Sequence, residues 1–372
     1  MIPRNKDPEY LYLHVPFCES ICYYCDFCHV VYHAGMAEKW LDAVSYELEQ
    51  RHVNPALRTI YIGGGTPTAL SCEELERLLG MLDPYREQVR EYTVEVNPGT
   101  LDDEKADILK KHGVNRVSVG MQSGNDMLLK TIGRKHTFED VRSCIGILRN
   151  AGIGSFSLDI MYGLPGQTMQ DLDETLADAL SLEPGHLSLY SLTIPENTVF
   201  ARRGVQPADE DLEADMYEHI VSVLTGKGYE HYEISNFALP GCRSLHNRAY
   251  WRYDDFYGIG AGASGKEDHI RYDHPSSLKV YIEDPMRTDD TPLTLNDEMF
   301  ENLMMSLRMR EGLDMRLFQE RYGFSFEQVF GAKAKRWIDE KCLIYENQHV
   351  RCTEKGMEIL NTVLADMMDE VQ

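Results

Sequence analysis

The chain has 372 residues, of which 43% are hydrophobic and 26% are charged, a composition that supports a folded core and excludes intrinsic disorder. Its 61 Asp and Glu against 37 Lys and Arg give a net charge of −24, which disfavours binding to nucleic acid or to an anionic membrane surface. The N-terminal sequence lacks a signal-peptide pattern, and no apolar run reaches the length of a membrane span. We therefore expect a cytoplasmic protein with reduced thiols.

Short β-branched and aromatic runs alternate with segments of helical periodicity in the first 226 residues. The expected strands are 10–15, 59–65, 92–98, 116–122, 155–165 and 186–194, and the expected helices are 36–51, 71–82, 102–112, 138–150, 170–182 and 209–226. Ser71 followed by Glu74 matches a capping box, and Gly113 follows an expected helix end. Six strand–helix units in succession predict a parallel α/β sheet, either doubly wound or a partial barrel, with its chemistry at the carboxyl edge of the strands.

The pattern changes after about residue 230. Residues 229–275 are rich in Tyr, His, Gly and Asn and predict an irregular stretch, whereas residues 295–372 are mostly of helical periodicity. We therefore expect an α/β core over 1–232, an irregular connecting segment over 233–290 and a helical C-terminal domain over 291–372.

Four of the nine cysteines fall between positions 18 and 28. Cys18, Cys22 and Cys25 form the spacing C-x3-C-x2-C directly after the first expected strand, and Cys28 follows. Such spacing allows one loop to direct several thiolates at one centre. Two kinds of metal site fit: a closed zinc site with four cysteines, or a 4Fe–4S cluster with three cysteines and one open iron. Aromatic residues around the cysteines and the glycine run 63–65 favour the open cluster.

The residues of this region resemble a known family. HVPFCESICYYCDF (14–27) followed by YIGGGTP (61–67) resembles the radical S-adenosylmethionine (SAM) superfamily. Further matches are VEVNPGT (94–100), GVNRVSVGMQS (113–123), LKTIGRKH (129–136), LDIMYGLPGQT (158–168), HNRAYW (246–251) and GIGAGASGK (258–266). Together they resemble the oxygen-independent coproporphyrinogen III oxidase family, and most of all its heme chaperone branch. The resemblance implies a partial (β/α)6 radical SAM barrel with a smaller, mostly helical C-terminal domain.

The resemblance also implies roles for single residues. Cys18, Cys22 and Cys25 would ligate a 4Fe–4S cluster, and the expected SAM contacts are Tyr12, Tyr24, Gly64, Gly65, Thr66, Glu95, Gln122, Arg134 and Asp159. The carboxylates of Glu95 and Asp159 can accept from ribose hydroxyls or the amino group, and Arg134 can pair with the SAM carboxylate. Taken singly, each has an ordinary alternative, since the two acids could cap helices and Arg134 could form a surface ion pair.

Two functions of the family compete. The oxidase uses a SAM-derived radical to decarboxylate propionate side chains, whereas the chaperone branch binds heme and delivers it to acceptor proteins. The oxidase has a fourth cysteine two positions after the third, where this chain has Phe27, and it carries an extension before its first strand, where this chain has nine residues. HNRAYW matches the heme-binding pattern H-N-x-x-Y-W of the chaperones. We therefore expect a heme chaperone, with the oxidase and a zinc-binding structural module as alternatives.

The expected heme contacts are His246, Asn247, Tyr250 and Trp251, although a histidine such as His246 is commonly a hydrogen-bonded core residue instead. His14 is a candidate for orienting the cysteine loop. Nucleic acid is not an expected partner. Peripheral membrane association and a homodimer are left open.

Overall fold

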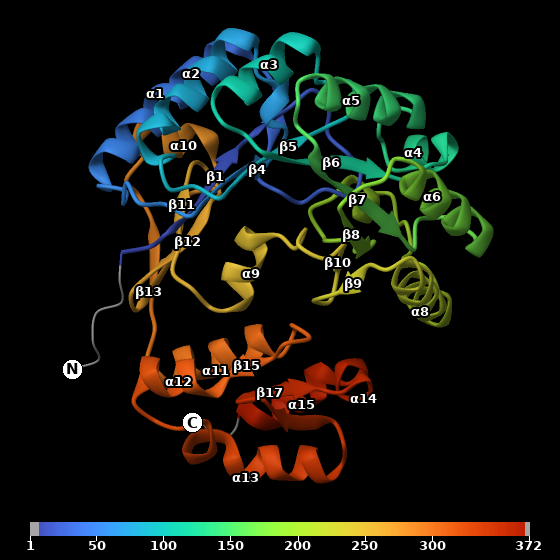
Figure 1. Cartoon of the computed structure of the whole chain (residues 1–372). Coiled ribbons are helices and arrows are strands. Elements are labelled where there is room, and N and C mark those ends of the chain that lie inside the picture. Colours follow the sequence, from blue (N-terminus) through green and yellow to red (C-terminus); the bar gives the residue numbers. More distant parts are fainter. Residues whose placement is uncertain (1–6, 369–372) are drawn as a thin grey trace.

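The computed structural model describes residues 7–368, and its larger part is a curved sheet with helices on the convex side (Figure 1). The sheet has nine strands in the order β11-β1-β4-β5-β6-β7-β8-β10-β9. Its six central strands are parallel: β1 (Tyr10–Val15), β4 (Thr59–Gly64), β5 (Glu91–Val96), β6 (Arg116–Gln122), β7 (Ser155–Tyr162) and β8 (His186–Ser191). Because these strands are neighbours in chain order, right-handed crossovers place all connecting helices on one face. A doubly wound sheet needs a reversal of the strand order, which these six strands do not have, so the fold is the expected partial barrel.

The main connecting helices are α1 (Ala34–Gln50), α2 (Cys72–Leu82), α3 (Asp103–Lys111), α5 (Phe138–Asn150), α6 (Met169–Ser181) and α8 (Glu210–Gly226). Local sequence sets their ends. Ser71 and Glu74 form the predicted capping box, and Gly113 adopts φ +85° just after α3, a conformation that favours glycine. All six predicted strands and helices are present. The predicted strands at 155–165 and 186–194 are each three residues too long, because the chain turns before their final residues.

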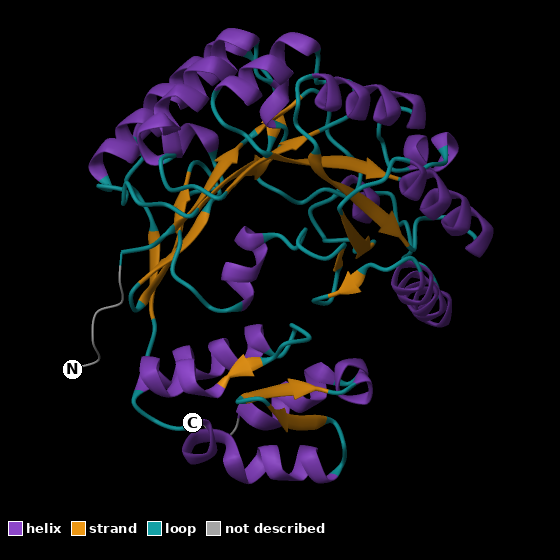
Figure 2. Ribbon diagram, in the orientation of Figure 1, coloured by secondary structure: helices purple, strands orange, loops and turns teal. Residues whose placement is uncertain are grey.

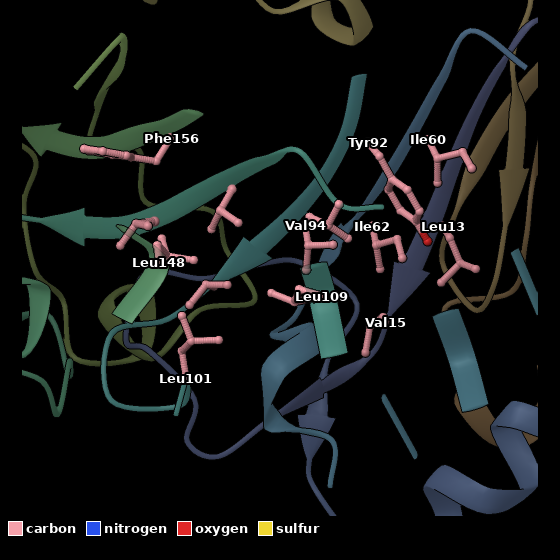
Figure 3. Packing of buried hydrophobic residues seen from close by; sticks show 14 of the residues in the cluster. Leu13, Val15, Ile60, Ile62, Tyr92, Val94, Leu101, Leu109, Leu148 and Phe156 are labelled. Atoms are coloured by element: carbon pink, nitrogen blue, oxygen red, sulfur yellow. The ribbon is translucent and has the colours of Figure 1, made fainter. Parts of the chain in front are cut away.

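Alternation along the strands separates an apolar outer face from a polar inner face. Leu13 on β1 and Ile60 and Ile62 on β4 are fully buried between the sheet and the helices (Figure 3). Leu11 on β1 is fully buried as well. The side chains between them, such as Tyr12, point to the concave face. The main hydrophobic core therefore lies outside the sheet, which leaves the inside of the barrel free for polar groups.

The segment 233–290 is not irregular as predicted. It contains β10 (Asn236–Ala238), α9 (Leu245–Trp251), β11 (Tyr257–Ile259), β12 (Ser264–Glu267), β13 (Ile270–Asp273), α10 (Leu278–Glu283) and β14 (Asp289–Pro292), after β9 (Glu230–His231). β11 extends the main sheet in parallel beside β1, and β10 extends it antiparallel to β8, whereas β12, β13 and β14 form a separate sheet. Strands of two to four residues are too short to show a periodic pattern in the sequence. Their stability comes from pairing with strands that are distant along the chain.

The C-terminal part is mostly helical, as predicted, with a small sheet that the sequence did not indicate (Figure 2). Its elements are α11 (Leu295–Ser306), β15 (Leu313–Asp314), α12 (Met315–Tyr322), α13 (Phe326–Asp339), β16 (Leu343–Glu346), β17 (His349–Cys352), α14 (Glu354–Glu358) and α15 (Leu360–Met368). It has its own hydrophobic core around Phe318, Phe326 and Phe330. Within residues 7–368, no helix combines the length and the apolar character that crossing a membrane requires.

Candidate functional site

A cavity of about 630 Å³ occupies the inside of the barrel. It collects most of the residues predicted from the sequence: Cys18, Cys22, Tyr24, Cys25, Gly64, Gly65, Glu95, Gln122, Arg134, Asp159 and Asn247. Tyr12, Thr66, His246, Tyr250 and Trp251 lie outside this lining. A second cavity, of about 730 Å³, lies between the start of β1 and the C-terminal part and contains none of the predicted residues.

The cysteine loop is held between two short parallel strands, β2 (Phe17–Cys18) and β3 (Val30–Val31). His14, on the inner face of β1, holds the backbone of the cysteine loop. Its Nε2 donates to the carbonyl of Cys28 at 2.7 Å, because a carbonyl can only accept, and its Nδ1 accepts from the Tyr12 hydroxyl at 2.9 Å. Burial lowers the pKa of His14, which keeps the ring in this neutral form. The ring packs on Gly64, where φ is +105° and any Cβ would overlap it.

Three thiols face the cavity and the fourth does not. The thiols of Cys18, Cys22 and Cys25 line the cavity, whereas the Cys28 thiol donates to the Ser276 carbonyl at 2.9 Å and packs against Gly262. Cys28 is therefore separated from the other three. Three thiolates in a cavity with space above them fit a 4Fe–4S cluster with one open iron. Among residues 7–368, no group of three or more His, Cys, Asp or Glu side chains is close enough together for a single metal ion.

Burial disfavours ionisation of the cysteine thiols in this loop. It raises the pKa of Cys18 and raises that of Cys25 to about 11, with the neighbouring thiols adding to the effect. Metal binding to these thiols would therefore release protons. Thr66, in the glycine-rich turn after β4, donates to the Cys18 thiol at 3.6 Å. The sequence predicted this residue as a SAM contact, and in the structure it also holds the cysteine loop.

Two carboxylates stand on the inner face of the sheet, on two strands that are separated by β6. Glu95 on β5 accepts from the Tyr61 hydroxyl at 2.7 Å and from the Gly64 amide at 3.0 Å, and burial raises its pKa to about 7. Asp159 on β7 accepts from the Ser118 hydroxyl at 2.9 Å, and burial raises its pKa as well. Neither carboxylate caps a helix in the described chain. Both retain acceptor capacity toward a ligand in the cavity.

Arg134 stands beside the cysteine loop without a carboxylate partner. Its guanidinium donates to the Asn97 side-chain oxygen at 2.6 Å and to the Tyr24 hydroxyl at 2.8 Å, and no acid of residues 7–368 forms an ion pair with it. The surface ion pair considered from the sequence is therefore not what this residue forms. Tyr24 and Asn97 hold the guanidinium in place, which leaves its charge available to an anion.

A backbone irregularity aims Gln122 into the cavity. The register between β6 and β7 shifts between Val119 and Gln122, and Gln122 has φ +63°, in the left-handed region. Such bulges at strand ends re-aim side chains and are associated with functional sites. Nothing in the sequence indicated this bulge.

The HNRAYW motif forms α9, which lies against the concave face of the sheet (Figure 1). His246 is 1% exposed, and both ring nitrogens have partners: Nδ1 lies 2.6 Å from the Thr59 hydroxyl and Nε2 lies 2.8 Å from the Tyr250 hydroxyl. The ring stacks on Tyr61 at 5.1 Å, and burial lowers its pKa to about 3. In this conformation His246 has no free nitrogen for an iron ion. The motif reaches the cavity through Asn247 instead.

Sequence reasoning missed several polar residues of the inner face, among them Tyr61, Asn97, Arg116 and Ser118. A signal was available on β6. Because side chains on a strand alternate, Arg116 and Ser118 lie on the same face of β6 as Gly120, which also lines the cavity.

Comparisons with known proteins agree with this architecture. The radical SAM superfamily pattern matches residues 12–179, and the HemN C-terminal domain pattern matches residues 293–359. The heme chaperone HemW of Lactococcus lactis is 39% identical over 98% of this chain and 99% of its own length. HemW of Bacillus subtilis is 38% identical over 97% and 99%. Among solved structures, coproporphyrinogen III oxidase (HemN) from Escherichia coli superposes with a TM-score of 0.83 at 23% identity, covering 98% of this chain and 91% of that chain, a likeness that shows the fold.

Proposed function

Because the chain belongs to the radical SAM superfamily and, within it, to the family of the heme chaperones HemW, we propose that it binds heme and delivers it to acceptor proteins. One observation carries the proposal: a single cavity joins the three-cysteine loop to Asn247 of the HNRAYW helix. A ligand in this cavity can therefore contact both the cysteine loop and the HNRAYW helix.

We propose that Cys18, Cys22 and Cys25 hold a 4Fe–4S cluster. When bound, such a cluster supplies an open iron position for SAM and a centre that can transfer an electron. The chain contributes the positioning. His14 fixes the loop backbone, and Thr66 donates to the Cys18 thiol.

The polar residues around the loop support SAM as the second ligand. Arg134 offers a charge without an acidic partner beside the cysteines, suited to the carboxylate of SAM. Glu95 and Asp159 offer acceptors to hydroxyl or amino groups. Because the pKa of Glu95 lies near 7, its acceptor strength changes within the physiological pH range.

The geometry changes the proposed part of His246. The ring joins α9 to β4 through Thr59 and Tyr61, so we assign His246 to the positioning of the helix. Asn247, next to it, is the member of the motif that lines the cavity, and Tyr250 acts through its hydrogen bond to His246.

The oxidase alternative has less support in the structure. The position of the oxidase's fourth cysteine is occupied by Phe27, which is 63% exposed, and the Cys28 thiol points away from the cavity. The likeness to HemN is at 23% identity and concerns the fold.

The experiment begins with anaerobic reconstitution of the full chain and analysis of iron, sulfide and zinc. About four irons per chain are expected, and zinc without iron would contradict the cluster. Heme is then titrated, and its transfer to an apo-heme protein is followed by absorbance. In parallel, the reduced protein is incubated with SAM and coproporphyrinogen III. Heme binding and transfer without decarboxylation support the chaperone, whereas formation of protoporphyrinogen would establish the oxidase.

A further inference from the structure

Arg116 is a buried cation that the cluster and the SAM contacts do not use. It is the first residue of β6, it is 6% exposed, and it lines the cavity. Only one other Lys or Arg of residues 7–368 is buried as deeply: Lys266, at 4%, which forms an ion pair with Asp255. The guanidinium of Arg116 has no hydrogen bond or ion pair to any residue that the structure describes.

A guanidinium that is largely removed from water, faces a cavity and has no ion pair favours an anionic ligand. The absence of an acidic partner is notable in a chain with 61 Asp and Glu against 37 Lys and Arg. Of the acids that line the cavity, Asp159 lies within electrostatic reach of Arg116 but does not form an ion pair with it, and it accepts from the Ser118 hydroxyl instead. Glu95 accepts from Tyr61 and Gly64.

The other titratable neighbours do not neutralise the guanidinium. His186 and His246 both lie within its electrostatic reach, and burial together with this positive charge lowers the pKa of each ring, so both are uncharged. Tyr61, on the adjacent face, remains protonated because burial raises its pKa. Asp159 is thus the acidic neighbour of Arg116 in the cavity, and because the two form no ion pair, the N–H groups of the guanidinium remain available to an anion.

Arg116 lies apart from Arg134, the cation assigned to SAM. The Arg134 guanidinium lies beside Gly120, which is four residues beyond Arg116 on β6, about 13 Å of strand. The register places Arg116 opposite Thr93 and Ser155, at the start of the neighbouring strands. The cavity thus has one guanidinium beside the cysteines and another toward α9, where Asn247 also lines it. The Asn247 amide group makes no side-chain hydrogen bond among the described residues.

We propose that Arg116 binds a carboxylate of the heme cargo, that is, one of its propionates, with the Asn247 amide as a second donor. The proposal rests on the proposed function and deepens it. A guanidinium offers two parallel N–H donors that match the two oxygens of a carboxylate, and the low-polarity surroundings strengthen this pairing. The same chemistry could serve the carboxylate of SAM, and the experiment separates the two sources.

The test uses the full chain with its cluster reconstituted. Heme and heme dimethyl ester, which keeps the iron and the ring but has no carboxylate, are titrated into wild type, Arg116→Gln and Arg116→Lys. The matched control is Arg142→Gln, because Arg142 is 58% exposed and pairs with Glu139 on α5. SAM binding to each protein is measured separately by calorimetry.

Wild type is expected to bind heme at least about tenfold more tightly than the ester, since a hydrogen bond to a charged group contributes about 1.5–3 kcal/mol. Arg116→Gln should lose this preference, because its affinity for heme should fall while its affinities for the ester and for SAM stay unchanged. Arg116→Lys should retain part of it, and Arg142→Gln all of it.

Equal affinity of wild type for heme and its ester would overturn the carboxylate site while leaving heme binding intact, whether or not the variants fold. Loss of SAM affinity in Arg116→Gln with an unchanged preference for heme would assign the residue to SAM instead. If wild type bound neither heme nor the ester, both this site and the proposed function would be refuted.

Discussion

Glu95 is the residue whose replacement tests most directly how the cavity handles buried charge. Burial raises its pKa from 4.5 to about 7. Because the pKa is higher in the folded than in the unfolded protein, the contribution of this group to stability is fully present below pH 4.5 and is lost as the pH rises through 7. Between about pH 5.5 and about pH 8, wild type should therefore lose about 2 kcal/mol of unfolding free energy from this group.

Glu95→Gln removes the ionisation and keeps the shape of the side chain. Its amide oxygen can still accept from the Gly64 amide. Urea unfolding of the cluster-free protein, followed by circular dichroism at both pH values, should show a pH-dependent loss of stability that is smaller by about 2 kcal/mol than in wild type. Glu139→Gln, a change at an exposed position on α5, should behave as wild type. The same pH dependence in Glu95→Gln and wild type would show that the carboxylate is not buried as the structure describes.

Three further predictions concern the loop and its neighbours. Cys22→Ala should lose the cluster, measured as iron and sulfide after reconstitution. Cys28→Ala should keep it, because the wild-type Cys28 thiol faces the Ser276 carbonyl and not the cavity. Iron loss from both variants would contradict the separation of Cys28 from the other three cysteines. Arg134→Gln should weaken SAM binding by about tenfold in calorimetry, and an unchanged affinity would remove this residue from the SAM site. His246→Ala should reduce the unfolding free energy by about 2–4 kcal/mol, since it deletes a packed ring that has two hydrogen bonds. The absorption maximum of bound heme should stay unchanged in this variant. A shifted maximum would identify His246 as an iron ligand.

The sequence was sufficient for the order of elements in the barrel, because local signals define them. Strand 10–15 alternates apolar and polar side chains, and α2 begins at a capping box in which Ser71 and Glu74 are three residues apart. The three cysteines that we propose to hold the cluster are equally local, since they lie within eight residues of one loop. Such features depend on neighbours along the chain and are readable without a structure.

Short strands were not predictable. β10 and β11 have three residues each, and they exist because they pair with β8 and β1. The small sheet of the C-terminal part was missed for the same reason.

The sequence by itself determined the fold class, and most of the site residues that it predicted do line the cavity. The tertiary structure alone decided what each side chain faces. His246 finds its partner Thr59 187 positions away, and the Cys28 thiol finds the Ser276 carbonyl 248 positions away. Arg116 is distinguished by finding no partner among the described residues. Whether a buried polar group is satisfied depends on atoms that folding brings together from distant positions, so only the folded chain shows which groups remain available to a ligand.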